Sequence, residues 1–222
     1  MSDSDAPGGR VGPLVVAVAG LKGGIAKTTT CIHLAGVLAD AGQKVLLADG
    51  DRIRTSTSWA RSGLLPFTVA PVSSLARARD YDVVILDTEG GPDNTELLEF
   101  ARTADLTVLP TTPDINGLDG AVQTAEILRT GGVTTDKFVC LLTMIRPKGM
   151  KEILARKALQ DQGITVMTSA VRLSEAFRDA ANSAVLVRDL KTDIAQKCWK
   201  DYEAVTTELI HRLSQGPEEA SA

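Results

Sequence analysis

The segment GLKGGIAKTT at residues 20–29 decides the fold class of this chain of 222 residues. It follows a continuous apolar run, LVVAVA at 14–19, and precedes a stretch at 28–41 in which apolar residues recur at helical spacing. A glycine-rich turn between a strand and a helix cradles anions, because glycine lets backbone N–H groups turn inward and the helix N-terminus adds partial positive charge. We expect Lys27 to reach the β- and γ-phosphates of a nucleotide and the Thr28 hydroxyl to bind Mg²⁺.

This turn departs from the common G-x-x-x-x-G-K-[ST] pattern, since Leu21 and Ala26 occupy its two glycine positions. What remains is K-G-G-x-x-K-T, with an additional lysine, Lys22, at the front. The loop predicted to hold the phosphates comprises Lys22, Gly23, Gly24, Ile25, Ala26, Lys27, Thr28 and Thr29.

Short apolar runs alternate with helix-length amphipathic segments along the rest of the chain. We expect strands near 45–48, 83–86, 106–109 and 138–142, and helices near 94–101, 118–129, 150–160, 174–181 and 192–213. This alternation is typical of α/β proteins whose parallel sheet is covered on both faces. The sequence therefore predicts a three-layer P-loop NTPase fold with a mostly parallel, twisted sheet. One domain is expected over 14–213, with short tails at 1–13 and 214–222.

Acidic residues follow two of the predicted strands. Asp49 and Asp51 come just after 45–48, and Asp87 ends the apolar strand at 83–86 in a Walker B pattern. Ligands of parallel sheets bind beyond the carboxyl ends of the strands, where such carboxylates can orient Mg²⁺ and water. The predicted metal ligands are Thr28, Asp49, Asp51 and Asp87. The turn at 89–91 is expected to be a mobile loop that senses the γ-phosphate.

The loop K-G-G-x-x-K-T resembles the deviant Walker A motif of the ParA/MinD family of ATPases, and the resemblance extends over 14–213. It implies an ATP-bound sandwich dimer in which Lys22 reaches the phosphates of the partner subunit. It also implies that Asp51 positions the attacking water. The predicted catalytic residues are thus Lys22, Lys27 and Asp51. The chain departs from the family's pattern at Arg52 and Ile53, which replace Pro and Gln, and at Glu89 and Gly90, which replace two prolines.

The identity of the base is predicted mainly from the same resemblance. Thr143 stands where the family often has an Asn for the adenine, so Thr143 and its neighbour Met144 are the candidate adenine contacts. No N-K-x-D guanine motif occurs in the chain, which favours ATP over GTP. The predicted cofactors are therefore ATP and Mg²⁺.

The formal net charge of −4 is unevenly distributed along the chain. Residues 1–145 carry −5, residues 146–200 carry +5 and residues 201–222 carry −4. Lysines and arginines without interleaved aromatic residues suit salt-sensitive contacts with nucleic-acid phosphates. The candidate DNA contacts are Arg146, Lys148, Lys151, Arg156 and Lys157. Ordinary solvated helix faces are the alternative explanation for a block of this size.

Several protein classes are excluded. The widely spaced Cys31, Cys140 and Cys198 favour neither a zinc site nor a disulfide framework. The N-terminus lacks the apolar core of a signal peptide, and the longest apolar runs, about eight residues, are too short for a membrane span. Glutamates near the C-terminus oppose a lipid-binding helix such as MinD-type members carry. We expect a cytoplasmic protein that does not bind membranes and associates with the nucleoid when ATP-bound.

Three functions remain open. The leading one, implied by the resemblance, is an ATPase that dimerises on ATP, binds DNA non-specifically and drives plasmid or chromosome partition. Its slow intrinsic hydrolysis would be stimulated by a ParB-like centromere-binding partner. The alternative is a positioning ATPase of the same type for a protein cargo or a cell-division site. A small-molecule kinase or ligase is the third, and both Lys22 and the lack of a separate substrate domain argue against it.

Overall fold

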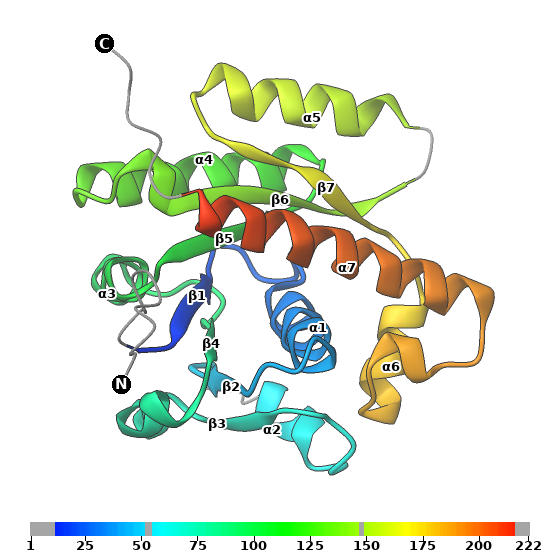
Figure 1. Cartoon of the computed structure of the whole chain (residues 1–222). Coiled ribbons are helices and arrows are strands. Elements are labelled where there is room, and N and C mark those ends of the chain that lie inside the picture. The colour runs from blue at the N-terminus through cyan, green and yellow to red at the C-terminus, as the bar shows by residue number, and fades with distance from the viewer. Residues whose placement is uncertain (1–11, 52–54, 147–148, 216–222) are drawn as a thin grey trace, which may run out of the picture.

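A parallel sheet of seven strands forms the centre of the molecule, in the order β3-β2-β4-β1-β5-β6-β7 (Figure 1). The computed structural model describes residues 12–51, 55–146 and 149–215. Every strand pairing is parallel. The strands are β1 (Leu14–Val18), β2 (Val45–Asp49), β3 (Thr68–Pro71), β4 (Val83–Asp87), β5 (Leu106–Thr111), β6 (Phe138–Ile145) and β7 (Val166–Arg172).

Helices connect successive strands. The α-helices are α1 (Lys27–Asp40), α2 (Thr55–Ala60), α3 (Asn94–Thr103), α4 (Ile115–Thr130), α5 (Met150–Asp161), α6 (Ala176–Ser183) and α7 (Asp193–Ser214). Three 3₁₀ helices complete the described elements: η1 (Val72–Asp80), η2 (Thr135–Lys137) and η3 (Val187–Asp189). A parallel connection needs a crossover of this kind because consecutive strands must run in the same direction.

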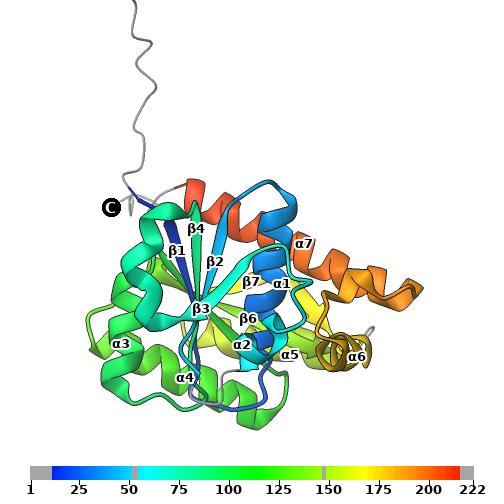
Figure 2. The ribbon, with the colours of Figure 1, turned by 90° about the horizontal axis from the view of Figure 1, so that it is seen from below.

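Two layers of helices cover the sheet. On one face, inward-pointing residues of six strands pack against α1, α2, α6 and α7. On the other face, α3, α4 and α5 cover β5 and β6, while η1 and α3 cover β2 and β4. Figure 2 shows the strands as a twisted fan, with α3 and α4 on one side and α1, α6 and α7 on the other. The predicted three-layer fold is confirmed.

Two edge strands and one helix do not follow from the sequence pattern. Strand β3 has only four residues, none of them buried. Strand β7 is buried at only three of its seven positions and contains Thr168 and Ser169, so it lacks a continuous apolar run. Helix α2 spans six residues of low apolar content. Edge elements bury less surface than central strands, so their hydrophobic signal is weaker.

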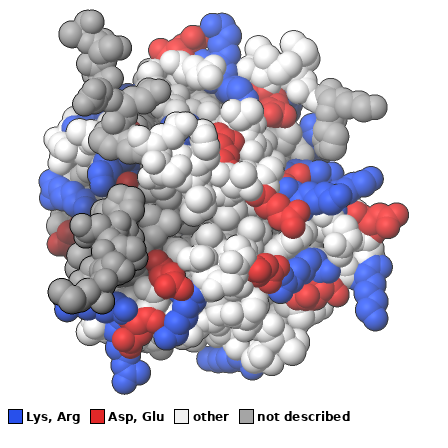
Figure 3. All heavy atoms as spheres, viewed as in Figure 1, with Lys and Arg blue, Asp and Glu red and all other residues white. Residues whose placement is uncertain are grey.

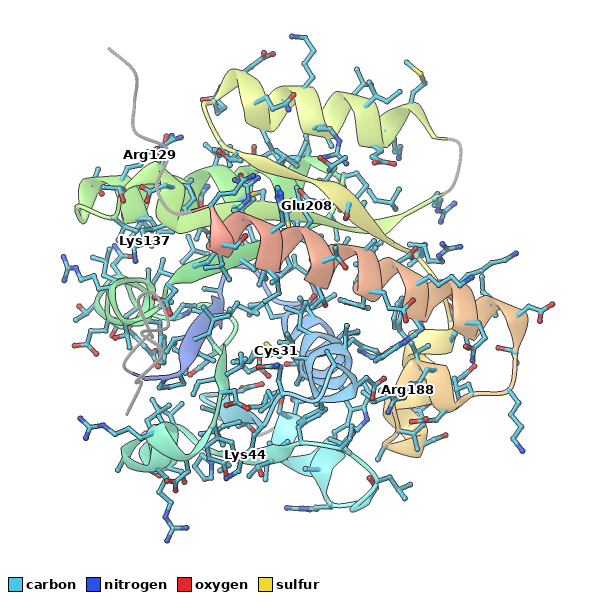
Figure 4. All side chains as sticks on the ribbon, viewed as in Figure 1. Cys31, Lys44, Arg129, Lys137, Arg188 and Glu208 are labelled. Carbon is cyan, nitrogen blue, oxygen red and sulfur yellow. The ribbon has the colours of Figure 1, made fainter. Side chains whose placement is uncertain are left out.

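The edge strand β7 contains a bulge whose polar groups are bonded by side chains from two helices. Val166 pairs with Cys140 and Ala170 with Leu142, which leaves extra residues on β7. The Glu208 carboxylate of α7 accepts the N–H groups of Thr168 and Ser169, both at 2.7 Å, and extends toward β7 in Figure 4. The neighbouring carbonyl groups of Met167 and Thr168 accept from the Arg156 guanidinium of α5.

Candidate nucleotide-binding site

The strand register brings three loops to one edge of the sheet. Asp49, the last residue of β2, lies beside Asp87, the last residue of β4, and Asp87 lies beside Val18 at the end of β1. The segments that follow these neighbouring strands therefore meet at their carboxyl ends, where open α/β sheets bind ligands.

An open cavity of about 410 Å³ lies among these loops. Its lining residues are Gly23, Gly24, Ala26, Lys27, Thr28, Thr29, Asp51, Thr88, Glu89 and Gly90. Most of them belong to the predicted phosphate loop. The structure thus brings Asp51 and the loop at 89–91 to the same space as the predicted anion cradle. Thr88 was not singled out from the sequence; its hydroxyl donates to the Val18 carbonyl and fixes the start of that loop.

Lys27 is the cation of this cavity. Its side chain is buried, and its ammonium group donates to the carbonyl of Lys22 at 2.8 Å, across the loop. Burial lowers the pKa of Lys27, and the nearby negative charges of Asp87 and Asp51 oppose that shift. A cation held at a helix N-terminus beside inward-turned N–H groups suits the binding of a polyphosphate.

The loop backbone adopts the left-handed conformation at a non-glycine residue. Ala26 has φ 69° and ψ 29° immediately before α1, at one of the positions where the common pattern places glycine. Gly24 also has positive φ, at 74°. The loop therefore keeps the shape of a phosphate cradle at a cost in backbone strain at Ala26.

Thr143 supports the loop from below. The side chain is fully buried, and its hydroxyl lies 3.2 Å from the carbonyl oxygens of Ile25 and Thr111, to which it donates. The prediction that Thr143 contacts the adenine is not supported, because no part of this residue reaches the surface. Met144, its partner in that prediction, is part-exposed with φ 54°. Ile25 is likewise buried and packs against Gly20 rather than lining the cavity.

Asp87 has the features expected of a metal ligand. One carboxylate oxygen accepts from Ser56 at 2.6 Å, while the other is buried and makes no hydrogen bond to the described residues. Burial raises the pKa of Asp87 to about 6, and polar contacts from Ser56, Thr28 and Cys31 partly offset this shift. An unsatisfied buried carboxylate oxygen beside a threonine hydroxyl fits a cation such as Mg²⁺. In the described residues no three His, Cys, Asp or Glu side chains cluster as a metal site, so phosphate oxygens would have to complete the shell.

The two aspartates after β2 have different surroundings. Both carboxylate oxygens of Asp49 accept hydrogen bonds, one from the N–H of Asp51 at 3.1 Å and the other from the N–H and hydroxyl of Thr57 at 2.7 and 2.5 Å. Both oxygens of the buried Asp49 are thus already bonded, which fixes the start of α2 and leaves Asp49 less suited to a metal than Asp87, whose second oxygen has no partner in the described part of the chain. Asp51 does line the cavity and accepts from Thr55 at 3.3 Å. Arg52 and Ile53 lie outside the described residues.

Lys22 is exposed and lies along α4 of its own subunit. A Cβ atom on Gly120 would approach Cγ of Lys22 to 2.5 Å, which places the aliphatic stem directly over this helix. The preceding N–H of Leu21 donates to the Thr124 hydroxyl of the same helix at 3.4 Å. The front of the loop is thus fastened to α4, and Lys22 does not line the cavity.

The loop at 89–91 lies close to the phosphate loop. A Cβ atom on Gly90 would lie 3.6 Å from both the ammonium nitrogen of Lys27 and the Cα of Gly23. Gly91, with φ 81°, approaches the carbonyl of Leu21 in the same way. A side chain at Gly90 would just reach van der Waals contact with the phosphate loop, and the positive φ of Gly91 favours glycine at that position.

Behind the cavity, His33 connects α1 to η3. Its Nδ1 lies 2.7 Å from the carbonyl of Thr29, a cavity residue, and its Nε2 lies 3.1 Å from the backbone nitrogen of Val187. Because the Val187 N–H can only donate, Nε2 is the acceptor and Nδ1 carries the proton. Tyr202 stacks on the ring at 5.0 Å and reaches Thr30 with its hydroxyl. Sequence reasoning gave His33 no role, although its position four residues after Thr29 allows this bond.

Only some of the candidate DNA contacts have side chains that are free to bind a phosphate. Arg146 and Lys151 are exposed, and Lys148 lies outside the described residues. Lys157 pairs with Asp161 at 3.1 Å. Arg156 is committed to Glu152 and to the β7 bulge, so its guanidinium is a poor candidate for a phosphate contact.

Elsewhere in the basic block, arginines pair with acidic residues from distant parts of the chain. Arg172 binds Asp201 through two bonds of 2.6 Å, and Arg188 pairs with Asp40 while lying over the Trp199 ring. On the face shown in Figure 3, basic and acidic side chains are intermixed over the surface. Among the described residues, no helix is both long and apolar enough to cross a bilayer.

A parallel α/β sheet with a lysine-bearing glycine loop after a central strand and a buried carboxylate on the adjacent strand defines a P-loop nucleotide-binding protein. Comparison with known proteins narrows that class. The sequence profile described as the CobQ/CobB/MinD/ParA nucleotide-binding domain matches residues 16–187. The chain therefore belongs to this family and is a ParA/MinD-family ATPase.

Named relatives fall into two groups. "Maintenance of carboxysome distribution protein A" from Gloeobacter kilaueensis is 32% identical over 206 residues, which are 89% of this chain and 94% of the relative. "Protein ParA" from Rhizobium radiobacter is 29% identical over 146 residues, 60% of this chain and 65% of the relative.

Solved structures share the fold. A plasmid partition protein from Borrelia burgdorferi bound to AMPPNP matches with a TM-score of 0.71 at 17% identity, covering 90% of this chain and 99% of that one. The ATP complex of McdA from Cyanothece matches with a TM-score of 0.70 at 16% identity, covering 90% and 97%. Identities this low show a common fold, whose members include nucleotide-bound structures.

Proposed function

We propose that this protein is an ATP-hydrolysing switch that positions a protein assembly in the cell. The main support for a nucleotide switch is that Lys27, Asp51 and the loop at 89–91 line the same cavity. The choice of cargo is supported by the relative from Gloeobacter kilaueensis, which is named for carboxysome distribution and matches along most of both chains. These similarities favour the protein-cargo reading over DNA partition.

In the proposed reaction the phosphate loop binds and orients ATP. Backbone N–H groups around Gly23 and Gly24 and the Lys27 ammonium group would hold the phosphate oxygens. Thr28 and Asp87 would hold Mg²⁺, which neutralises phosphate charge when bound. Asp51 faces the cavity and would orient the attacking water, as the family resemblance implies. Phosphoryl transfer of this kind depends on positioning and electrostatics, so a slow rate is expected without a stimulating partner.

The close approach of the loop at 89–91 to Lys27 and Gly23 would supply the switch. A phosphate entering beside Lys27 would meet the Gly90 backbone, so nucleotide binding and the position of this loop are coupled. Lys22 would leave its place over Gly120 and reach the nucleotide of a second subunit, giving an ATP-dependent homodimer. Loop ordering by a γ-phosphate is a recurrent mechanism of such switches.

DNA partition with a ParB-like partner is the second candidate. The match to "Protein ParA" supports it, over a smaller part of the chain. Arg146 and Lys151 are the exposed described cations that a non-specific DNA surface would use here. ATP-dependent retention on random-sequence DNA that weakens steeply between low and moderate salt would favour this reading.

The switch is tested by phosphate release and light scattering on the purified protein with ATP. Asp51→Ala should reduce turnover at least tenfold while ATP-dependent dimerisation persists, and Lys22→Ala should abolish the dimer. Lys197→Ala, an exposed lysine at the start of α7, serves as the matched control. Unchanged turnover in Asp51→Ala would refute the hydrolytic assignment. A requirement for an added small-molecule acceptor would favour a kinase or ligase instead.

The cargo is tested separately. The Asp51→Ala protein, held in its ATP state, is used as bait in lysate of its own source, and the bound proteins are identified by mass spectrometry. Recovery of proteins of a large assembly or of their adaptor supports protein positioning. Recovery of a centromere-binding protein together with DNA would favour DNA partition over protein positioning.

A further inference from the structure

The outward face of α5 carries large apolar side chains. Met150, Ile153 and Leu154 are 66%, 62% and 59% exposed. Their spacing of three and four residues places them on one side of the helix. The buried side of α5 consists of Ala155 and Leu159, which pack in the core cluster formed with α4 and β6. In the first turns of this helix, the larger apolar side chains therefore face solvent instead of the protein core.

This arrangement differs from the scattered apolar exposure found on any protein surface. The other large exposed apolar residues of the described chain lie far apart from one another in sequence: Leu64, Ile115, Leu173, Ile194 and Ile210. Only α5 groups three of them within five residues. Grouped apolar side chains with a polar rim mark interaction sites on soluble proteins. In Figure 3 the surface over α5, at the top of the view, includes a white area beside charged side chains.

The charges around this face identify the chemistry of its partner. Glu152 pairs with Arg156, and Asp161 pairs with Lys157, so the acidic residues of α5 are neutralised internally. Arg146 and Lys151 remain exposed and form no ion pair with the described residues. The rim is therefore positive and the centre apolar, which complements a segment that presents apolar and acidic side chains together.

DNA fits this face less well than such a segment. Phosphate contacts use cationic and hydrogen-bonding side chains, whereas the centre of this face is formed by the apolar Met150, Ile153 and Leu154. The guanidinium of Arg156, which would contribute to a DNA surface, is held by the β7 bulge.

We propose that the outward face of α5, defined by Met150, Ile153, Leu154 and Lys151, is a docking site for an amphipathic acidic segment of a partner protein. Helix α5 follows β6 at the carboxyl edge of the sheet, the edge that also holds the nucleotide cavity. The site would thus recruit a protein on the side where the switch operates. Peptide binding at this site does not require ATP hydrolysis. The docking proposal can therefore be refuted or supported independently of the proposed function.

The test uses a synthetic helical peptide with leucine at every third or fourth position and glutamate elsewhere. Binding to the full-length protein is measured by fluorescence anisotropy at low and moderate salt. We expect micromolar binding that weakens at least tenfold in the Ile153→Ser/Leu154→Ser variant and several-fold in Lys151→Glu. The exposed Ile194→Ser, on α7, is the matched control and should leave binding unchanged. Because all these positions are exposed, thermal unfolding should confirm that each variant is folded.

Three results would overturn the proposal. A peptide with lysine in place of glutamate that binds equally well would show that charge does not select the partner. A 20-base-pair duplex that binds through Lys151 but is indifferent to Ile153→Ser/Leu154→Ser would assign the face to DNA. Concentration-dependent dimerisation without ATP, lost in the same double variant, would assign it to a second copy of this chain.

Discussion

At the scale of single residues, Ala26 stores strain at the entrance of α1. Its φ of 69° is in the left-handed region, where a Cβ atom costs about 1 kcal/mol relative to glycine. Ala26→Gly should therefore raise the unfolding free energy by about 1 kcal/mol, less the extra entropy that glycine gives the unfolded chain. Chemical denaturation without nucleotide measures the change.

Ala184 provides the control for this prediction. It ends α6 with φ 51°, far in sequence from the phosphate loop, and Ala184→Gly should stabilise the protein by a similar amount. If Ala184→Gly stabilises and Ala26→Gly does not, the loop conformation at Ala26 is held by something other than the backbone preference of its own residue.

His33 gives the stability of the protein a defined pH dependence. Burial lowers the pKa of His33 to about 4, whereas an unfolded histidine titrates near 6.5. Between these values the unfolded chain binds more protons, so the histidine's contribution is complete above pH 6.5 and is lost as the pH falls toward 4. The loss amounts to about 3 kcal/mol at most.

Comparison with His33→Gln isolates this effect. The variant should be less stable at pH 7.5, because it loses the ring contacts, and the gap to the wild type should narrow as the pH falls from 6.5 to 4.5. Urea denaturation at several pH values measures both curves. A gap that stays constant with pH would mean that His33 is not neutral in the folded protein.

The residues of the phosphate loop were predictable because their function is encoded in contiguous sequence. Lys27, Thr28 and the following carboxylates can be located by counting from a strand. The true surroundings of Asp49, Thr143 and Arg156 could not be predicted in this way. Thr143 bonds to Ile25 and Thr111, which are 118 and 32 residues away, and Arg156 bonds to a bulge on another strand. Such partners exist only after the sheet has formed.

At the scale of elements, α4 shows how two glycines of one helix serve different purposes. A Cβ atom on Gly117 would come within 2.6 Å of the Thr112 backbone carbonyl, which cannot move without disturbing β5. A Cβ atom on Gly120 would meet only the flexible stem of Lys22. The first glycine lets the start of the helix approach its strand, and the second gives Lys22 a place to lie.

Alanine at the two positions should therefore have opposite effects on thermal stability. Gly117→Ala should destabilise by about 1–3 kcal/mol through the backbone clash. Gly120→Ala should be neutral or stabilise by up to about 1 kcal/mol, because alanine favours the helix and Lys22 can swing away. Circular dichroism melting curves compare the two directly. Destabilisation of equal size in both variants would show that Lys22 is fixed as firmly as the backbone.

Elements at the edge of the sheet were the hardest to predict. Central strands such as β1 and β4 are buried on both sides and therefore appear as continuous apolar runs. Strand β7 is stabilised in part by side chains of α5 and α7, so its own sequence carries only part of the signal. Helical spacing alone likewise does not say which side of α5 faces the sheet.

At the scale of the whole molecule, charge blocks along the sequence do not correspond to charged surfaces. The positive block at 146–200 is partly neutralised by Asp40 and Asp201, which belong to the negative blocks on either side. Folding thus mixes charges that the sequence separates. After these pairs form, Arg146 and Lys151 near α5 remain exposed, as do Lys191, Lys197 and Lys200 near and on α7.

The predicted domain limits of 14–213 imply a single cooperative unit. Both faces of the sheet are covered by helices drawn from the whole length of the chain, with α7 packed against α1. A chain cut to residues 12–215 should therefore melt in one transition, at the same temperature as the full chain. Calorimetry should give equal calorimetric and van't Hoff enthalpies. Two transitions would show that part of the molecule unfolds separately.

The pairing of Glu208 with the β7 bulge bears on whether this sheet edge can pair with the edge of another molecule. An open edge strand offers unpaired N–H and C=O groups to the edge of another molecule, which is the first step of cross-β aggregation. Here a carboxylate from α7 occupies two such N–H groups and a guanidinium from α5 occupies the adjacent carbonyl groups. The last helix thus serves two purposes, since it fills the core on one face of the sheet and occupies backbone groups of the edge strand that could otherwise pair with a second molecule.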